Sequence, residues 1–143
     1  MPTGISVLDG ATQQANIWID EVDQAAHCSD RQRAYRLLRA TLHTLRDWVN
    51  ADQAADLGAQ LPVLIRGVYY EGWDPSSTPV KFRKLSEFID RMDDETPFSD
   101  ANDATKSIAA AASVLRRHVT EGEIEDIRSS LPKDLQSVVG DAA

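Results

Sequence analysis

The chain contains two copies of one helical pattern, and the second copy lies 70 residues after the first. Leu61-Pro62 recurs at this offset as Leu131-Pro132, and the match extends in both directions without a gap. The positions that agree are mainly apolar positions at helical spacing, helix caps and Leu-Pro helix starts, which are the positions that define a fold. Identical pairs are Ile19/Ile89, Ala34/Ala104, Leu45-Arg46/Leu115-Arg116, Val49/Val119, Asp56/Asp126 and Val68/Val138. The sequence therefore predicts an internal repeat, residues 9–73 and 80–140, joined by a short linker at 74–79.

Each copy is predicted to form four short amphipathic helices. The first helix is predicted to begin after Asp9, as its cap, and to run to about Ala26, with apolar residues at steps of four and three. Its stripe is Ala11, Ala15, Trp18, Val22 and Ala25. Patterns typical of capping boxes begin later helices at Ser29 and Thr120, and Asn50 offers another cap. No segment alternates with a period of two, so the predicted fold class is all-α.

The two copies are expected to share one core. A unit of about 60 residues is only marginally stable alone, whereas 143 residues are enough for one compact domain over residues 1–143. We therefore expect a helical bundle in which two tandem four-helix repeats are related by an approximate two-fold axis.

The segment Leu61–Trp73, LPVLIRGVYYEGW, is the most distinctive part of the first copy. Pro62 and Gly72 stand where a short helix would begin and end. Apolar residues recur at helical spacing between them, so the segment predicts a short, mostly buried helix. These residues are Leu61, Leu64, Ile65, Val68 and Tyr69.

Charge and composition argue against several classes of partner. The formal net charge is −8 and the pI is about 4.7. Nucleic-acid binding needs a basic surface, and an anionic membrane would repel such a chain equally. The N-terminus lacks a basic region followed by an apolar one, so no signal peptide is expected. The longest apolar run, residues 108–115, is far shorter than the ~20 residues of a membrane span. We therefore expect a cytoplasmic protein that binds neither nucleic acid nor membranes.

Three segments carry a longer pattern: LRATLHTLRDWV, AADLGAQLPVLIRGVYYEGWDPSSTPVKFRKLSEFI and VTEGEIEDIRSSLPKDL. Together they resemble the bacterial domain of unknown function DUF2267, and the resemblance covers nearly the whole chain. It implies a small all-helical domain. It implies no activity or catalytic residue, because that family is defined by sequence and not by an established reaction. The matching residues are Leu61, Pro62, Arg66, Gly67, Tyr70, Gly72, Trp73 and Pro79, then Gly122, Glu123, Leu131 and Pro132.

The first candidate site is an aromatic groove in the first copy. Arg66 and Tyr70 lie four residues apart and share one helix face, and Trp73 follows. Tyr, Trp and Arg dominate binding hot spots, so these three residues predict a surface that receives a partner. The alternative is structural: Trp73 packs over the junction between the repeats, and Arg66 pairs with a carboxylate. The second copy has Gln136, Gly140 and Ala143 at the equivalent positions, which mildly favours a role specific to the first half.

A second candidate site is a basic concentration after the linker. Lys81 and Arg83, with Lys84 and Arg91 nearby, are suited to an anion or an acidic partner, or they balance the acidic residues 93–95. The predicted function is accordingly a non-enzymatic interaction or scaffold module that binds a protein partner, with a homodimer as one form of that binding. The alternative is a small-molecule or anion-binding protein with a pocket between the repeats and Arg66, Lys81 and Arg83 as polar anchors.

Residues for catalysis or metal binding do not converge in the sequence. None of His27, His43 and His118 has a second histidine at helical spacing. Most of the paired carboxylates lie in loops or in first helical turns, where they favour the helix dipole. Neither a Gly-rich phosphate loop nor a nucleophile motif occurs. We therefore expect no enzyme, no cofactor and no metal.

Overall fold

The computed structural model describes residues 2–80 and 84–140 of the chain. This part consists of eight α-helices and one 3-10 turn, and it contains no strand. The all-α prediction is therefore confirmed. The helices are α1 (Ser6–Ala26), α2 (Arg31–Trp48), α3 (Ala51–Ala59), α4 (Val63–Tyr70), α5 (Leu85–Asp93), α6 (Ala101–His118), α7 (Glu121–Ser129) and α8 (Lys133–Gly140), and the turn η1 (Pro75–Ser77) follows α4.

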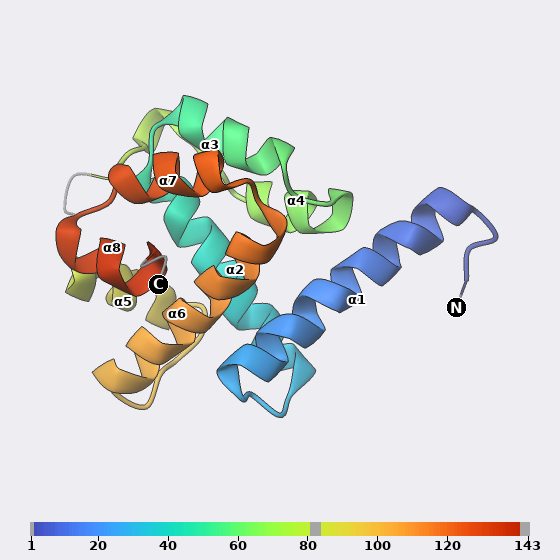
Figure 1. The fold of residues 1–143 in the computed structure, drawn as a ribbon, viewed down its shortest axis with the longest axis horizontal. Helices are drawn as coiled ribbons and strands as arrows, with labels where there is room; N and C mark the ends of the chain where they lie inside the picture. The colour runs from blue at the N-terminus through green and yellow to red at the C-terminus, as the bar shows by residue number, and fades with distance from the viewer. Residues whose placement is uncertain (1, 81–83, 141–143) are drawn as a thin grey trace.

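Helices α2 and α6 form the centre of the molecule (Figure 1). They pack on each other, and α1 packs across both of them. Helices α3, α4 and α5 pack against α2, α8 packs against α6, and α7 contacts α3 and α8. The C-terminal half of α1 belongs to this assembly, α4 packs against α1, and the N-terminal end of α1 projects beyond the other helices (Figure 1).

The core is built from the apolar stripes that the sequence shows. Trp18 of α1, Leu38 of α2 and Ile108 of α6 are fully buried, so three long helices meet in one cluster. Phe88 brings α5 into the same cluster, and its ring meets Trp48 edge-on with 5.0 Å between ring centroids. Burying such side chains stabilises each by about 1.5–3 kcal/mol, which holds the short helices that would not persist alone.

The bounds of the helices follow the offset of 70 closely. Helices α2, α3 and α4, shifted by 70 residues, have the same bounds as α6, α7 and α8. The fourth pair differs, because α1 has 21 residues and α5 has nine. Helix α5 begins at Leu85, the counterpart of Ala15. Residues 6–14 of α1 therefore extend the helix beyond what α5 has.

The start of α1 differs from the sequence prediction. The helix begins at Ser6, and Asp9 lies in its first turn instead of before it. The Asp9 carboxylate accepts hydrogen bonds from the Thr3 backbone N–H at 2.7 Å and from the Thr3 hydroxyl at 2.9 Å. These bonds lower the pKa of Asp9 and fold the preceding loop back onto the helix. The side chain thus caps a turn outside the helix, which a cap assignment from sequence does not anticipate.

Other predicted helix starts hold with small differences. Asn50 and Gln53 form a reciprocal capping box at α3. Asp30, one residue after the predicted Ser29, caps α2. Thr120 accepts the Glu123 N–H at the start of α7. The caps therefore locate helix starts to within a residue wherever the side chain accepts from the helix itself.

Candidate functional site

Arg66 closes the C-terminal end of α3. Its guanidinium donates from Nε to the Gly58 carbonyl at 2.8 Å, and from Nη2 to the carbonyls of Leu61 at 2.8 Å and Ala59 at 3.2 Å. The Gly58 and Ala59 carbonyls belong to the last turn of α3, whose carbonyls lack intrahelical partners, and Leu61 follows in the connection to α4. Gln136 makes the corresponding bond to the Leu131 carbonyl at 2.7 Å. Arg66 therefore bonds to backbone carbonyls, whereas the sequence suggested that it pairs with a carboxylate or with an incoming partner.

Tyr70 and Trp73 lie together, but both are half-buried. Their ring centroids are 5.3 Å apart, and the Tyr70 ring also meets the Tyr69 ring edge-on at 5.0 Å. Tyr70 packs over Gly58 of α3, which has no side chain to obstruct it. The indole Nε1 of Trp73 is buried and makes no hydrogen bond to any residue that the structure describes. The structure thus brings two of the predicted residues into contact without exposing them as one apolar patch.

Helix α4 is less buried than its sequence suggested. Ile65 and Tyr69 face the core, and the Tyr69 hydroxyl donates to the Ala54 carbonyl at 2.7 Å. Val63 and Leu64, in its first turn, are exposed. The other two predicted site residues, Lys81 and Arg83, lie outside the described residues.

A polar cluster missed by the sequence analysis connects α2 with the ends of α4 and α5. Arg39, His43 and Arg46 stand at steps of four and three on one face of α2. Arg46, only 3% exposed, donates to the carbonyls of Tyr69 at 2.9 Å and Glu71 at 2.8 Å, and pairs with Asp47. Like Arg66 at α3, it satisfies carbonyls at a helix end. The remaining members of the cluster are Glu71, Arg91 and Glu95, and together with Gly72 they line a shallow, open depression.

Glu95 is the acceptor at the middle of this polar cluster. It pairs with Arg39 and Arg91, and its Oε1 lies 3.3 Å from Nδ1 of His43. Burial alone would raise the pKa of Glu95, but the Arg91 hydrogen bond and the three neighbouring cations outweigh burial and lower it. The other ring nitrogen of His43 lies 2.6 Å from the Val68 carbonyl. Both ring nitrogens of His43 therefore face oxygen atoms of other elements. The cluster therefore joins α2 to the ends of α4 and α5 through charged side chains.

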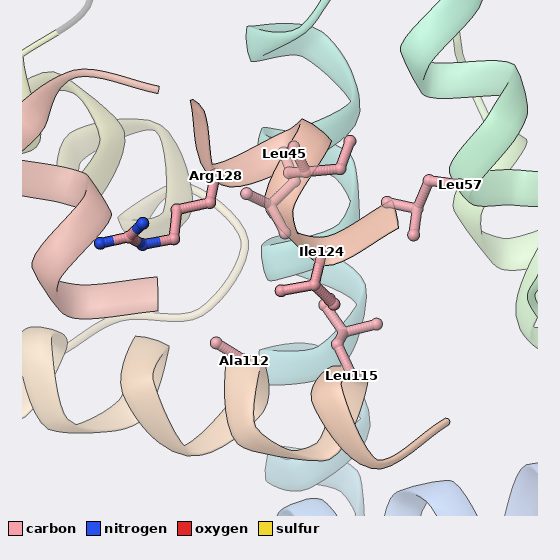
Figure 2. Close-up of a pocket in the computed structure, with 7 residues that line it drawn as sticks. Leu45, Leu57, Ala112, Leu115, Ile124 and Arg128 are labelled. Carbon is pink, nitrogen blue, oxygen red and sulfur yellow. The ribbon is translucent and has the colours of Figure 1, made fainter. Parts of the chain in front are cut away.

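The cavity between the two halves is small and apolar. It is lined by side chains from α2, α3, α6 and α7, which surround it in Figure 2. Its volume is about 20 Å³, which is room for about one water molecule. Arg66 does not line it. The lining residues are Leu45, Leu57, Ala112, Leu115, Ile124, Ile127 and Arg128.

The exposed large apolar side chains gather on two neighbouring elements. Val7 and Leu8 of α1 are 77% and 48% exposed, and Val63 and Leu64 of α4 are 58% and 45% exposed. Ile5 and Ile17 are also exposed, and α4 packs against α1. Leu8 continues the stripe of Trp18 and Val22 toward the N-terminus through Ala11 and Ala15. We call Val7 and Leu8 of α1, together with Val63 and Leu64 of α4, the α1–α4 surface.

This surface carries almost no charge. Residues 2–19 include one ionisable side chain, Asp9, whereas charged residues make up 27% of the whole chain. A neutral apolar face on a protein of net charge −8 is suited to an apolar partner and offers nothing to a strongly charged one.

The sequence contained a signal for this surface that was not used. Leu8 lies three residues before Ala11 and so extends the stripe of α1 by one step. The stripe runs on past the end of the core, and sequence periodicity alone does not show where burial stops.

Glu123 is a buried carboxyl group at the start of α7. It is 8% exposed, and its Oε1 makes no hydrogen bond. Burial, with the nearby carboxylates of Asp56 and Asp126, raises the pKa of Glu123. The residue at the equivalent position in the first half is Gln53, whose amide donates to Ser130. The first half thus places a neutral donor where the second half has a poorly satisfied acid.

Replacing Glu123 by glutamine is expected to raise the free energy of unfolding by about 1 kcal/mol at pH 7. The pKa of Glu123 is higher in the folded protein than its usual 4.5, so wild-type stability falls as the pH rises from 4.5 through the folded-state pKa. The gain should therefore be larger at pH 7 than at pH 4.5 in urea titrations. Glu125→Gln, at an exposed position, is the control. Equal gains at both pH values would contradict the explanation.

The fold and surface define a small all-helical protein with an exposed apolar face. No helix in the described ranges is both long and apolar enough to span a membrane. The same residues hold no group of three or more potential metal ligands. The family model of an uncharacterized conserved protein, DUF2267, matches residues 15–138. The chain therefore belongs to the DUF2267 family, as its sequence pattern indicated. No curated protein matches it.

Proposed function

We propose that this protein is a non-enzymatic helical interaction module that binds a protein partner through the α1–α4 surface. The observation that carries the proposal is the position of the exposed apolar side chains. They lie on the part of α1 that extends from the molecule and on the first turn of α4 beside it. Contiguous exposed apolar surface is typical of an interaction site.

Burial supports the choice of this surface over the aromatic groove. Arg66 donates to three backbone carbonyls, and Tyr70 packs on α3, so both already have partners within the chain. The α1–α4 surface has none. A pocket protein remains the alternative prediction. The apolar cavity between α2, α3, α6 and α7 has room for about one water molecule, and the larger hollow between α1 and α6 is open to the surface.

Site-specific photo-crosslinking in cells tests the interaction. A photoreactive residue at Val7, on the stripe side of α1, is expected to give a discrete crosslinked product. The same residue at Gln13, on the opposite side of the helix, is the matched control and is expected to give none. If neither position crosslinks, or both do so equally, the surface is not a docking site.

We also propose that the two four-helix units are related by an approximate two-fold axis. Helices α2 and α3 each pack on their own counterparts, α6 and α7, and α1 packs on α6 as α5 packs on α2. Gln60 exchanges hydrogen bonds with Thr120, the cap of α7, while Ser130 accepts from Gln53 beside the cap of α3. Ser130 is the counterpart of Gln60, so both contacts join the end of one helix to the start of its counterpart, although Ser130 meets Gln53 and not Asn50, the counterpart of Thr120. An experimental structure in which residues 31–70 superpose on 101–140 by a rotation far from 180° would contradict this arrangement.

A further inference from the structure

We infer that the partner of the α1–α4 surface is a second copy of this chain, bound by antiparallel packing of two α1 helices. The inference rests on the proposed function and adds the identity of the partner. Three features carry it: the weakness of the extended half of α1 as an isolated helix, its lack of charge, and the small residues that follow Leu8 along its stripe.

Residues 6–14 make a poor helix by themselves. None of them is buried, and the N-cap residue Ile5 provides no side-chain hydrogen bond. The segment also contains Gly10 and two β-branched residues, Val7 and Thr12, which lower helix propensity. A helical segment of this length is marginal in water. Its helical state therefore requires that something cover the apolar side.

The lack of charge along the extended half of α1 indicates the kind of partner that covers this half. Two molecules that each carry a net charge of −8 repel each other over most of their surfaces. Along residues 2–19 only Asp9 contributes to that repulsion, and its carboxylate is engaged with Thr3 at the start of the helix. A basic partner would find no acidic group on the stripe. A second copy brings the same neutral, apolar side.

The stripe itself is suited to pairing with an identical helix. Its members in the extended part are Leu8 and Ala11, and Ala15 follows at the edge of the core, where it is half-buried. In an antiparallel pair centred near Ala11, Leu8 of one copy lies opposite Ala15 of the other, so a large side chain meets a small one on both sides of the axis. Small residues at the centre let the two backbones approach closely, and the interface is closed by its own two-fold symmetry.

A stable interface buries about 800 Å² on each partner, which is more than half of one helix provides. Val63 and Leu64 of α4 supply exposed apolar surface next to α1. The interface therefore consists of α1 and α4 from both copies, and changes in α4 should weaken it as well.

The position of residues 6–14 also bears on whether the dimer is specific to this chain. Helix α5 lacks an equivalent of residues 6–14, and the family match begins at residue 15. The dimer-forming segment is thus an addition to the repeated unit and lies before the region that the family model matches.

Sedimentation equilibrium over a wide concentration range tests the inference. Wild type and Gln13→Glu, which adds a charge on the opposite side of α1, should both give the mass of two chains. Leu8→Glu places the same charge on the stripe and should give the mass of one chain, with an apparent Kd raised at least 100-fold. Circular dichroism confirms that each variant is folded. A monomeric wild type at every concentration, or a dimeric Leu8→Glu, overturns the inference.

Hydrogen exchange gives an independent measurement. Amides of residues 9–16 should be protected in concentrated wild type, lose protection on dilution, and be unprotected in Leu8→Glu. Protection that does not change with concentration contradicts the inference. The mass of the Val7 crosslinked product separates this inference from the proposed function. A product of two chains supports both, a product with a different protein removes only the dimer, and no product removes both.

Discussion

Replacing Arg46 by methionine is expected to lower the free energy of unfolding by about 3–5 kcal/mol. Methionine keeps much of the aliphatic stem, so the loss comes from the guanidinium. Without it the carbonyls of Tyr69 and Glu71 lose a hydrogen-bond donor, and the Asp47 carboxylate loses its ion-pair partner. Unfolding in urea, followed by circular dichroism, measures the change.

The matched control for this prediction is Arg33→Met. Arg33 is an exposed arginine on the same helix, and its nearest carboxylate, Asp103, is 3.7 Å away. An exposed pair of this kind contributes about 0–1 kcal/mol. Similar losses in the two variants would show that Arg46 does not hold the end of α4 to α2.

Replacing Gly58 by alanine is expected to destabilise the protein by about 1–3 kcal/mol, although alanine is the better helix former. A Cβ at this position would lie 2.7 Å from Cζ of Tyr70 and 3.1 Å from Cε2 of Tyr69, and it would also contact the Tyr70 hydroxyl. Tyr69 is buried and bonded to Ala54, so it has little freedom to move aside. Thermal and urea unfolding measure the loss.

Two further variants show whether the Tyr70 ring causes that loss. In a Tyr70→Ala background, Gly58→Ala should destabilise the protein much less, because only the 3.1 Å contact with Tyr69 then remains. Gly67→Ala, on α4 with open space around its Cα, should instead gain up to about 1 kcal/mol. The second half of the chain agrees with the packing explanation. It has the larger Arg128 in place of Gly58, and Gly140 in place of Tyr70. A loss of equal size with and without Tyr70 would contradict the packing explanation.

Most of the helices could be predicted because their signals are local. Capping side chains such as Asn50 act within one turn, and the apolar stripes report burial along each helix. The predicted start of α1 was wrong by several residues, because the Asp9 side chain bonds to the loop before α1 and not to the helix that follows Asp9. A sequence pattern does not distinguish these two directions.

The candidate site was harder to predict because its contacts join distant parts of the chain. The face of Arg39, His43 and Arg46 is visible on α2, but its acceptor Glu95 lies more than 40 residues later. Arg66 was identified as notable, yet its three acceptors are carbonyls whose positions depend on how α3 ends. Residue types indicate which side chains are able to interact, whereas tertiary packing decides which partners they meet.

The hydrogen bonds that join α3 to α7 have a consequence for the order of events on the ribosome. Gln60 reaches its partner Thr120, and Gln53 reaches Ser130, only after the second half has been made. At 5–20 residues per second, synthesis of residues 74–130 takes roughly 3–10 s. During that delay Leu45 and Leu57 on the nascent first half lack the helix that later covers them. We expect the emerging chain to depend on cotranslational chaperones until α7 has left the exit tunnel.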